Sequence, residues 1–414
     1  MGTETVRQIS GLALITAVCL LGDSFLYVAL PVFWRDLGLL NIWEVGVLLS
    51  INRLIRLPLH PFIGWIYSRI SIQSGIIVAV VLAGVSTIGY GAVHSFTGFL
   101  VLRVLWGVAW TLLRQGAYAA IFSASQSSQM GHLIGTYNGL YRVGSLVGVL
   151  VGGILTEWVS FSLIVTVFGL LTIPLVPVVM RYLRVSHSTA IDPNTSGRQD
   201  VSFGSMNGIT SWQITIVIGT AFLVAMLFQG IVTSSISRLI SVYVGSISWA
   251  GIIWGAASVA GVLHALRWGW EPWVSPFIGK KLDAQSSNNR NLFLTTVFFM
   301  NAVLFCLVSI TASHLLFIIL LLMIQFFATV LTTSMDVQLN GIISNENKTV
   351  LISSFALAVD AGAALGPLLG FVLTEQQLFA VSAGILFSLS ALWFFSQVKN
   401  KPKQIIHTNI IEPK

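Results

Sequence analysis

The chain has 414 residues, of which 55% are hydrophobic and only 8% are charged, and its mean hydropathy is +0.88. Soluble globular chains carry about 25% charged residues, so this composition excludes them and predicts an integral membrane protein. The net charge of +7 is then explained by membrane topology, and we expect no nucleic-acid partner. Cys19 and Cys306 both lie in apolar runs and indicate no disulfide, metal site or cofactor.

Apolar runs of about 20 residues, long enough to cross a bilayer, recur twelve times along the chain. The first run is too long for a signal-peptide core and lacks a small-residue cleavage site, so we expect it to remain as a helix. A polar stretch at 183–210, rich in Ser, Asn and Gly, is predicted to be a cytoplasmic linker between two sets of six runs. The runs are expected at 9–34, 42–66, 73–93, 97–122, 133–157 and 160–182, and then at 211–236, 249–279, 292–310, 314–340, 349–373 and 377–396.

The basic residues outside these runs predict the orientation. With the amino terminus in the cytoplasm, thirteen of them fall on the cytoplasmic side and Arg35 falls on the other. Cytoplasmic loops are enriched in Lys and Arg, so both termini, including a tail at 399–414, are predicted to be cytoplasmic in a protein of the cytoplasmic (inner) membrane. The thirteen are Arg7, Arg69, Arg181, Arg184, Arg198, Lys280, Lys281, Arg290, Lys348, Lys399, Lys401, Lys403 and Lys414.

Two stretches in opposite halves of the chain are nearly alike. The tetrapeptide Pro-Phe-Ile-Gly occurs at 61–64 and again, 215 residues later, at 276–279. Internal duplication in an apolar chain is typical of secondary transporters, in which two similar helical bundles rock about a central site. We therefore predict two pseudo-symmetric six-helix bundles, at 1–182 and 211–398. Five further positions recur 218 residues later: Gly144, Gly148, Gly152, Thr156 and Glu157 match Gly362, Gly366, Gly370, Thr374 and Glu375.

Local motifs resemble those of the major facilitator superfamily. Its loop signature, a Gly followed four residues later by Asp among basic residues, matches Gly-Lys-Lys-Leu-Asp at 279–283, whereas the corresponding loop of the first half has Ser68 in place of Asp. On the fourth run, Arg103 and Gly107 match an Arg-x-x-x-Gly motif that the family associates with proton coupling. The resemblance implies an all-α membrane protein with twelve transmembrane helices and a functional monomer.

The glycines of the fifth run also resemble the family's antiporter motif, although Val149 replaces the usual proline. Glycines at 144, 148 and 152 form one smooth stripe that allows two helices to pack closely. A hinge between the bundles is compatible with the same stripe.

Charged residues occur where lipid is expected, and arginine is in excess. A charge at the middle of a bilayer costs at least about 2.5–3.5 kcal/mol, so most of these side chains must face an aqueous cavity or a partner. If each acid takes one arginine, three arginines remain for an anion that is not protein. The arginines are Arg53, Arg56, Arg103, Arg114, Arg142, Arg238 and Arg267, and the acids are Asp23, Glu271, Asp336 and Asp360.

Helical spacing groups several of these residues. Arg53, Arg56 and His60 share one face of the second run, and His264, Arg267 and Glu271 share one face of the eighth. Histidines on such faces could relay protons, or be satisfied structurally.

The resemblance also implies that the second helix packs near the eleventh and the fifth near the eighth. Arg142 and Glu271 lie at similar depths from the cytoplasmic ends of their runs, as do Arg56 and Asp360. We predict that these two ion pairs hold one face closed and break or protonate during rocking. Static pairs that merely allow the residues to insert are the alternative.

Asp23, in the middle of the first run, is the leading candidate for a proton carrier, because a buried carboxyl can load and unload a proton near neutral pH. The equally weighted alternative is a structural acceptor for Arg103 or a tyrosine. Glu271, Asp336 and Asp360 are further candidates for proton coupling.

The arginines left without an acid predict a binding site for an anion, because guanidinium forks bind carboxylate or phosphate through two hydrogen bonds. Trp106 and Trp110, four residues apart, could stack on a substrate or on a buried arginine, or simply pack. The predicted substrate-binding residues are Arg53, Arg56, Arg103, Arg114, Arg267, Trp106 and Trp110.

Two functions remain open on this basis. The first is a proton-coupled transporter of a small anionic organic solute, with a polycarboxylate such as a carboxylate siderophore favoured. The second is a multidrug/proton antiporter that exports amphipathic cations. The sequence holds no His-Glu-x-x-His helix, Gly-x-Ser-x-Gly elbow or phosphate loop, so we do not expect an enzyme.

Overall fold

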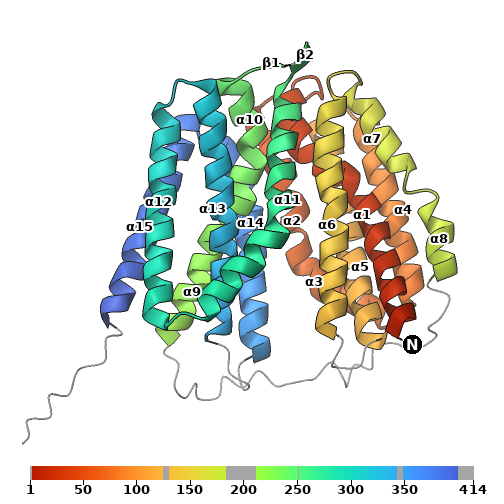
Figure 1. Cartoon of the computed structure of the whole chain (residues 1–414). Coiled ribbons are helices and arrows are strands. Elements are labelled where there is room, and N and C mark those ends of the chain that lie inside the picture. The colour runs from red at the N-terminus through yellow and green to blue at the C-terminus, as the bar shows by residue number, and fades with distance from the viewer. Residues whose placement is uncertain (1, 125–129, 183–210, 250, 343–347, 400–414) are drawn as a thin grey trace, which may run out of the picture.

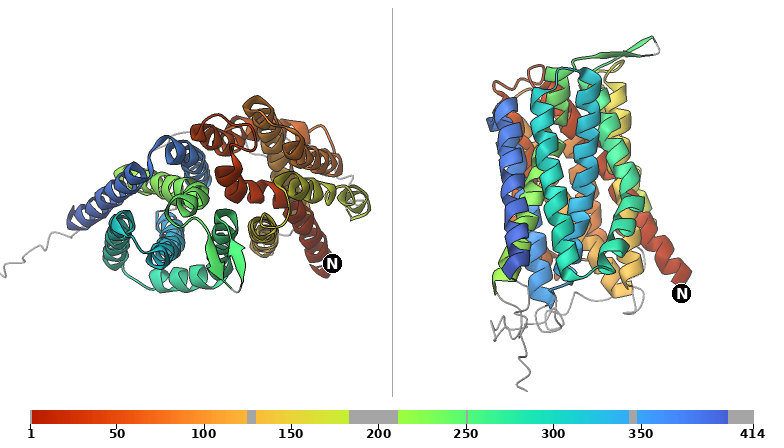
Figure 2. Two further views of the ribbon diagram at one scale, coloured as in Figure 1. Left: turned by 90° about the horizontal axis from the view of Figure 1, so that it is seen from above. Right: turned by 60° about the vertical axis from the view of Figure 1, so that its left-hand side comes forward.

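A computed structural model of the chain describes residues 2–124, 130–182, 211–249, 251–342 and 348–399. The helices run roughly along one direction (Figure 1), and the view from above in Figure 2 shows the first half of the chain on one side and the second half on the other. The predicted linker 183–210, and the tail from residue 400 onward, lie outside the described residues. The expected all-α membrane fold, with two six-helix bundles, is confirmed.

The N-terminal bundle has six spans, two of them built from two helices. They are α1 (Gly2–Phe33), α2 (Ile42–Leu54) with α3 (Arg56–Tyr67), α4 (Ile72–Ala92), α5 (Phe96–Ala124), α6 (Met130–Leu155), and α7 (Phe161–Leu170) with α8 (Leu175–Tyr182).

The C-terminal bundle repeats this arrangement. Its spans are α9 (Ser211–Val224) continued by the π-helix η1 (Ala225–Val232) and by α10 (Thr233–Tyr243), then α11 (Ala256–Asp283), α12 (Ser287–Ile310), α13 (His314–Asn340), α14 (Lys348–Val372) and α15 (Glu375–Lys399).

Ten of the twelve spans are long and apolar enough to cross a membrane by themselves within the described chain. The second span, which is divided into α2 and α3, is not among the ten. This break follows from Pro58, which has no N–H to donate to the carbonyl of Leu54 four residues earlier. The eighth span, α11, carries Arg267 and Glu271 near its middle.

The eighth span begins later than the sequence indicates. The expected start at 249 falls in a short antiparallel hairpin of β1 (Ile247–Trp249) and β2 (Ile252–Trp254), which projects from one end of the bundle (Figures 1 and 2). Gly251 lies in its turn with φ of +76°, a left-handed conformation that favours glycine. The predicted boundary is wrong because apolar β-branched residues suit a strand as well as a helix. A bend is visible in the lower half of α11, the half that contains Pro272 and Pro276, whose missing N–H groups interrupt the helical hydrogen bonds.

The repeated glycines of the first half lie against α1. A Cβ added at Gly144 would collide with the backbone carbonyl of Ala17, and one added at Gly148 would collide with that of Leu21. The close-packing interpretation of the stripe is thereby confirmed.

The matching glycines of the second half make the equivalent contact with the seventh span. A Cβ at Gly362 would collide with the carbonyl of Phe222, and Gly366 faces Gly230 at backbone distance. The duplication therefore extends from sequence to packing: the fifth span packs on the first as the eleventh packs on the seventh.

Helix starts follow the same duplication. Ser71 caps α4 by accepting a hydrogen bond from the N–H of Ser74 at 3.1 Å, and Ser286 caps α12 by accepting one from the N–H of Asn289 at 3.4 Å. A serine at this position satisfies one of the free N–H groups at the start of a helix.

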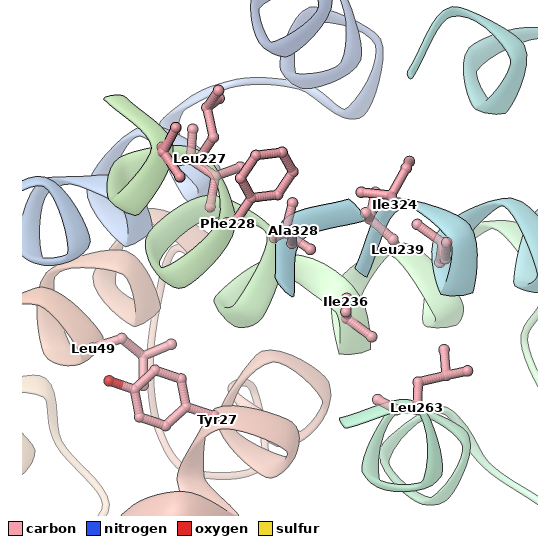
Figure 3. Packing of buried hydrophobic residues seen from close by; sticks show 14 of the residues in the cluster. Tyr27, Leu49, Leu227, Phe228, Ile236, Leu239, Leu263, Ile324 and Ala328 are labelled. Carbon is pink, nitrogen blue, oxygen red and sulfur yellow. The ribbon is translucent and has the colours of Figure 1, made fainter. Parts of the chain in front are cut away.

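Buried apolar side chains from both bundles meet in one large cluster, part of which is drawn in Figure 3. A second cluster belongs to the N-terminal bundle alone. The labelled residues of Figure 3 are Tyr27 and Leu49 from the first bundle, and Leu227, Phe228, Ile236, Leu239, Leu263, Ile324 and Ala328 from the second.

We expect Gly144→Ala to lower the free energy of unfolding by about 1–3 kcal/mol, because the added methyl group overpacks the contact with α1. Gly139→Ala in the same helix is the matched control. No atom lies within 4 Å of a Cβ at Gly139, so this change should be neutral or stabilise by up to about 1 kcal/mol through helix propensity. Thermal unfolding of the purified variants in detergent measures both; equal stability of the two would contradict a tight α1–α6 contact.

Candidate functional site

A cavity of about 670 Å³ lies between the two bundles and is lined by helices of both. The first bundle contributes residues of α1, α2, α3, α5 and α6, and the second contributes residues of α9, η1, α10, α11, α13 and α14. Small-molecule sites typically enclose about 300–1,000 Å³, so the cavity has the size of an organic ligand.

The cavity is closed at the end that carries the β1–β2 hairpin. There α6 meets α11 so closely that a Cβ at Gly153 would lie 2.7 Å from the carbonyl oxygen of Ala257. The Glu157 carboxylate, at the end of α6, accepts a 2.7 Å hydrogen bond from the N–H of Gly255 and another from the hydroxyl of Ser258. The repeated Glu157 thus joins the two bundles.

A second contact closes the same end. Helices α2 and α14 approach until a Cβ at Gly46 would lie 2.8 Å from the carbonyl oxygen of Pro367, and Ser50 Oγ accepts a 3.1 Å hydrogen bond from the N–H of Leu368. Toward the other end, Gly139 on α6 and Gly269 on α11 have open space before them. The contacts between the bundles are therefore concentrated on the hairpin side.

The lining is charged on both sides. Nine ionisable side chains of the predicted set reach it, five of them arginines and four of them acids. They are Arg53, Arg56, Arg114, Arg142, Arg267, Asp23, Glu271, Asp336 and Asp360.

Four of these arginines have no acid within ion-pair distance anywhere in the described chain: Arg267 of the second bundle, and Arg53, Arg56 and Arg114 of the first. Arg53 Nε donates to the Tyr27 hydroxyl at 3.2 Å, and Arg56 Nη2 donates to Asn52 Oδ1 at 2.7 Å. We call the three residues of the first bundle, Arg53, Arg56 and Arg114, the arginine wall.

The two tryptophans of the fourth span have different positions. Trp106 and Trp110 stack with ring centroids 5.9 Å apart, and the Arg56 guanidinium lies over both, 5.2 Å from the Trp110 ring. Trp110 lines the cavity, whereas Trp106 is fully buried and absent from the lining. This conformation therefore does not support the predicted direct contact of Trp106 with substrate; Trp106 instead stacks on Trp110 beneath the Arg56 guanidinium.

Asp23 is held by Arg103. Its Oδ1 accepts hydrogen bonds from Arg103 Nη1 and, at 2.9 Å, from Asn52 Nδ2, while Arg103 Nε donates to the carbonyl of Leu48 at 2.8 Å. Arg103 is fully buried and does not line the cavity, so this conformation does not support its predicted role in substrate binding. For Asp23 this geometry matches the alternative, a structural acceptor for Arg103.

Of the two predicted pairs between the bundles, the structure contains one. Arg142 Nη1 lies 2.5 Å from Glu271 Oε1, with side-chain exposures of 55% and 30%. Arg56 and Asp360 both line the cavity but form no ion pair, so that pairing is wrong for this conformation, in which Arg56 is bound to Asn52.

Arg267 is bound to the backbone of the seventh span. Its Nη1 donates to the Phe228 carbonyl at 3.2 Å and to Thr233 Oγ1 at 3.0 Å. Phe228 lies in η1, where π-helical hydrogen bonding shifts the carbonyls from their α-helical partners, a feature frequent at functional sites. The sequence gives no signal for η1, because its composition is that of any apolar helix.

Asn52 and Tyr27 are the site residues that sequence reasoning missed. Asn52 connects Asp23 to Arg56, and Tyr27 accepts from Arg53. One signal for Asn52 was present: it lies four residues before Arg56, one helical turn away on the same face.

The remaining arginine and histidines lie apart from this network. Arg238 Nη2 pairs with Glu375 at 2.7 Å and Nη1 donates to the carbonyl of Gly370, close to the end of α14. His60 Nδ1 accepts a 3.0 Å hydrogen bond from Gln115 Nε2, and His264 stacks on Trp268.

We expect Asp23→Asn to destabilise the protein by about 3–5 kcal/mol, because it leaves the fully buried Arg103 without its counter-charge. Asp336→Asn is the matched control, since Asp336 is exposed to the cavity and has no ion-pair partner in the described chain. Thermal unfolding in detergent separates them, and a loss no larger for Asp23→Asn than for Asp336→Asn would contradict a structural role for the Asp23–Arg103 pair.

Comparison with curated proteins finds distant relatives that align over only a short stretch of the chain. The chain is 26% identical over 137 residues to the quinolone resistance protein NorA of Staphylococcus aureus (strain MRSA252), a match covering 33% of this chain and 35% of NorA. It is 25% identical over 142 residues to the uncharacterized MFS-type transporter MJ1560 of Methanocaldococcus jannaschii, covering 34% and 36%. The aligned part thus spans about a third of either relative.

Solved structures share the fold over almost the whole chain. A bacterial homolog of the human lysosomal transporter Spinster, inward-facing and occupied, matches with a TM-score of 0.69 at 13% identity, over 95% of this chain and 96% of that one. A peptide transporter POT in complex with sulfate matches with a TM-score of 0.73 at 12% identity, over 96% and 94%. The family model described as Major Facilitator Superfamily matches residues 12–283. Together with the twelve-span fold and its central cavity, this match shows that the chain belongs to the Major Facilitator Superfamily.

Proposed function

We propose that the protein is a proton-coupled, alternating-access transporter of a small organic solute that carries a carboxylate or phosphate group. The observation that carries this proposal is the arginine wall: three cations of one bundle reach the cavity without an acidic partner in the described chain. Guanidinium groups bind such anions through paired, charge-assisted hydrogen bonds. A polycarboxylate, such as a carboxylate siderophore, is the solute that could engage all three.

Alternating access is supported by the distribution of contacts between the bundles. They are tight on the hairpin side, at Gly46 and Gly153, and open toward the other end, at Gly139 and Gly269. With the amino terminus in the cytoplasm, this conformation opens inward. We further propose that the protein lies in the cytoplasmic (inner) membrane with both termini inside and works as a monomer.

Proton coupling is assigned to carboxyls that reach the cavity. Asp336 and Asp360 form neither an ion pair nor a hydrogen bond with any described residue, and so are free to bind a proton. Glu271 would respond through its pair with Arg142. Asp23 is the weaker candidate, since it is already bound by Arg103 and Asn52.

A multidrug/proton antiporter for amphipathic cations is the second candidate. The partial similarity to a quinolone resistance protein favours it, and the aromatic lining residues Trp110, Tyr141, Trp268 and Phe355 suit a flat, apolar solute.

The two candidates are separated by thermal stabilisation of the purified protein against polycarboxylates, iron-bound and iron-free siderophores, sugar phosphates and lipophilic cations. We expect saturable stabilisation by an anion, with at least a tenfold weaker midpoint in Arg53→Ala and Arg56→Ala. Arg35→Ala is the matched control, because Arg35 lies over Trp34 at the end of α1 and away from the cavity. Stabilisation by cations alone, unchanged in the two wall variants, would favour the multidrug antiporter.

A gating role for the Arg142–Glu271 pair predicts charge-swap behaviour. We expect Arg142→Glu and Glu271→Arg to reduce transport of a stabilising anion into proteoliposomes at least tenfold each, because each places like charges together across the two bundles. The double swap should restore most of the rate. If it restores none, the contact between these side chains is not what the transport cycle requires.

A further inference from the structure

We infer that the solute is a zwitterion, whose anionic group binds the arginine wall and whose cationic group binds Asp336 and Asp360, which we call the acidic wall. This inference rests on the proposed function, because it uses the same cavity and the same arginines. It adds the second charge of the substrate, which neither candidate function includes.

The first step is to remove the charges that already have partners. Asp23 is matched by Arg103, and Glu271 is matched by Arg142. Arg267 is engaged by two neutral acceptors, the Phe228 carbonyl and Thr233 Oγ1, and it is 7% exposed. Four of the nine ionisable lining residues, Asp23, Glu271, Arg142 and Arg267, are therefore already engaged by other groups of the protein.

The five remaining charges are segregated by bundle. Arg53, Arg56 and Arg114 belong to the second and fourth spans of the first bundle. Asp336 and Asp360 belong to α13 and α14 of the second bundle, and neither forms an ion pair or a hydrogen bond with a described residue. One side of the cavity is cationic and the other anionic.

No ion pair or hydrogen bond joins the two walls among the described residues, although Asp360 is near enough to attract the three arginines electrostatically. Asp336 and Asp360 accept no hydrogen bond from any described residue, and Arg56 donates instead to Asn52. A carboxylate can only accept and a guanidinium can only donate, so each wall needs a ligand of the opposite kind.

A solute with a single charge would match only half of this arrangement. A plain anion neutralises the arginine wall but brings its own charge toward two carboxylates, and a plain cation meets the reverse problem at the arginines. Like charges in a partly desolvated cavity repel, which is how binding sites reject wrong ligands. A zwitterion places each of its charges against the opposite wall.

The space between the walls is suited to an apolar body. Trp110 and Tyr141 of the first bundle and Trp268 and Phe355 of the second line the same cavity. Aromatic side chains offer flat faces to planar or apolar groups. The substrate class is therefore an amphipathic molecule with an apolar middle, a carboxylate or phosphate at one end and an ammonium at the other.

The test uses sets of three probes in which one charge at a time is blocked. One set is the dipeptide Phe-Ala, its methyl ester and its N-acetyl derivative; the other is a quinolone carboxylate with a basic amine, its methyl ester and its N-acetyl derivative. Each probe is titrated into the full-length purified protein, and its midpoint is the concentration that gives half of the maximal rise in unfolding temperature. We expect, in at least one set, a midpoint at least tenfold lower for the zwitterion than for either blocked derivative.

Variants assign each charge to its wall. In Arg56→Gln, the zwitterion should reach half-maximal stabilisation only at the concentration that the ester needs in the unchanged protein. In the double variant Asp336→Asn, Asp360→Asn, it should need the concentration that the N-acetyl derivative needs. Arg35→Gln, outside the cavity, should change neither midpoint.

The outcomes distinguish this inference from the proposed function. An N-acetyl derivative that binds as tightly as its zwitterion overturns the zwitterion and leaves the anion transporter standing. An ester that binds as tightly overturns both. If no member of either set stabilises the protein while a polycarboxylate does, the zwitterion is again overturned and the proposed function retained.

Discussion

The buried pair of Asp23 and Arg103 is the interaction on which the first bundle depends. It joins the first and fourth spans, and Arg103 also donates to the Leu48 carbonyl, while Asp23 receives Asn52 from the second span. Three spans are thus tied at one point inside the membrane, where an unmatched charge is expensive. Because Asn52 also accepts from Arg56, the same network sets the position of the arginine wall. The position of the arginines in the cavity therefore depends on the buried, charge-neutral pair of Asp23 and Arg103.

The second bundle has no such buried pair at the equivalent place among its described residues. Its seventh span passes through η1, and Arg267 holds the carbonyl of Phe228 and the hydroxyl of Thr233 rather than an acid. The two bundles share their backbone repeat and their glycine contacts, yet differ in how they stabilise charge. The glycine contacts between helices are therefore common to the two bundles, whereas the partners of their buried arginines differ.

The sequence predicted the parts that depend on local pattern. Twelve apolar runs, the repeat of Gly144 in Gly362 and the pairing of Arg142 with Glu271 follow from periodicity and from depth along a helix. The sequence did not predict which side chains face the cavity or which partners they bind, because these depend on contacts between helices that are distant in the chain. Arg103 and Trp106 carry the same signals as true lining residues, but both are turned into the protein and fully buried. Arg56 is bound by a neutral Asn52, which no charge count anticipates.

The hairpin β1–β2 projects beyond the helices and is continuous, through Gly255, with α11 (Figures 1 and 2). Gly255 is also the residue whose N–H is held by Glu157 across the boundary between the bundles. An antibody fragment that binds this hairpin would therefore be attached directly to the start of α11, the helix that carries Glu271. By favouring or resisting the movement of α11, such a reagent could trap a single state of the cycle for structure determination.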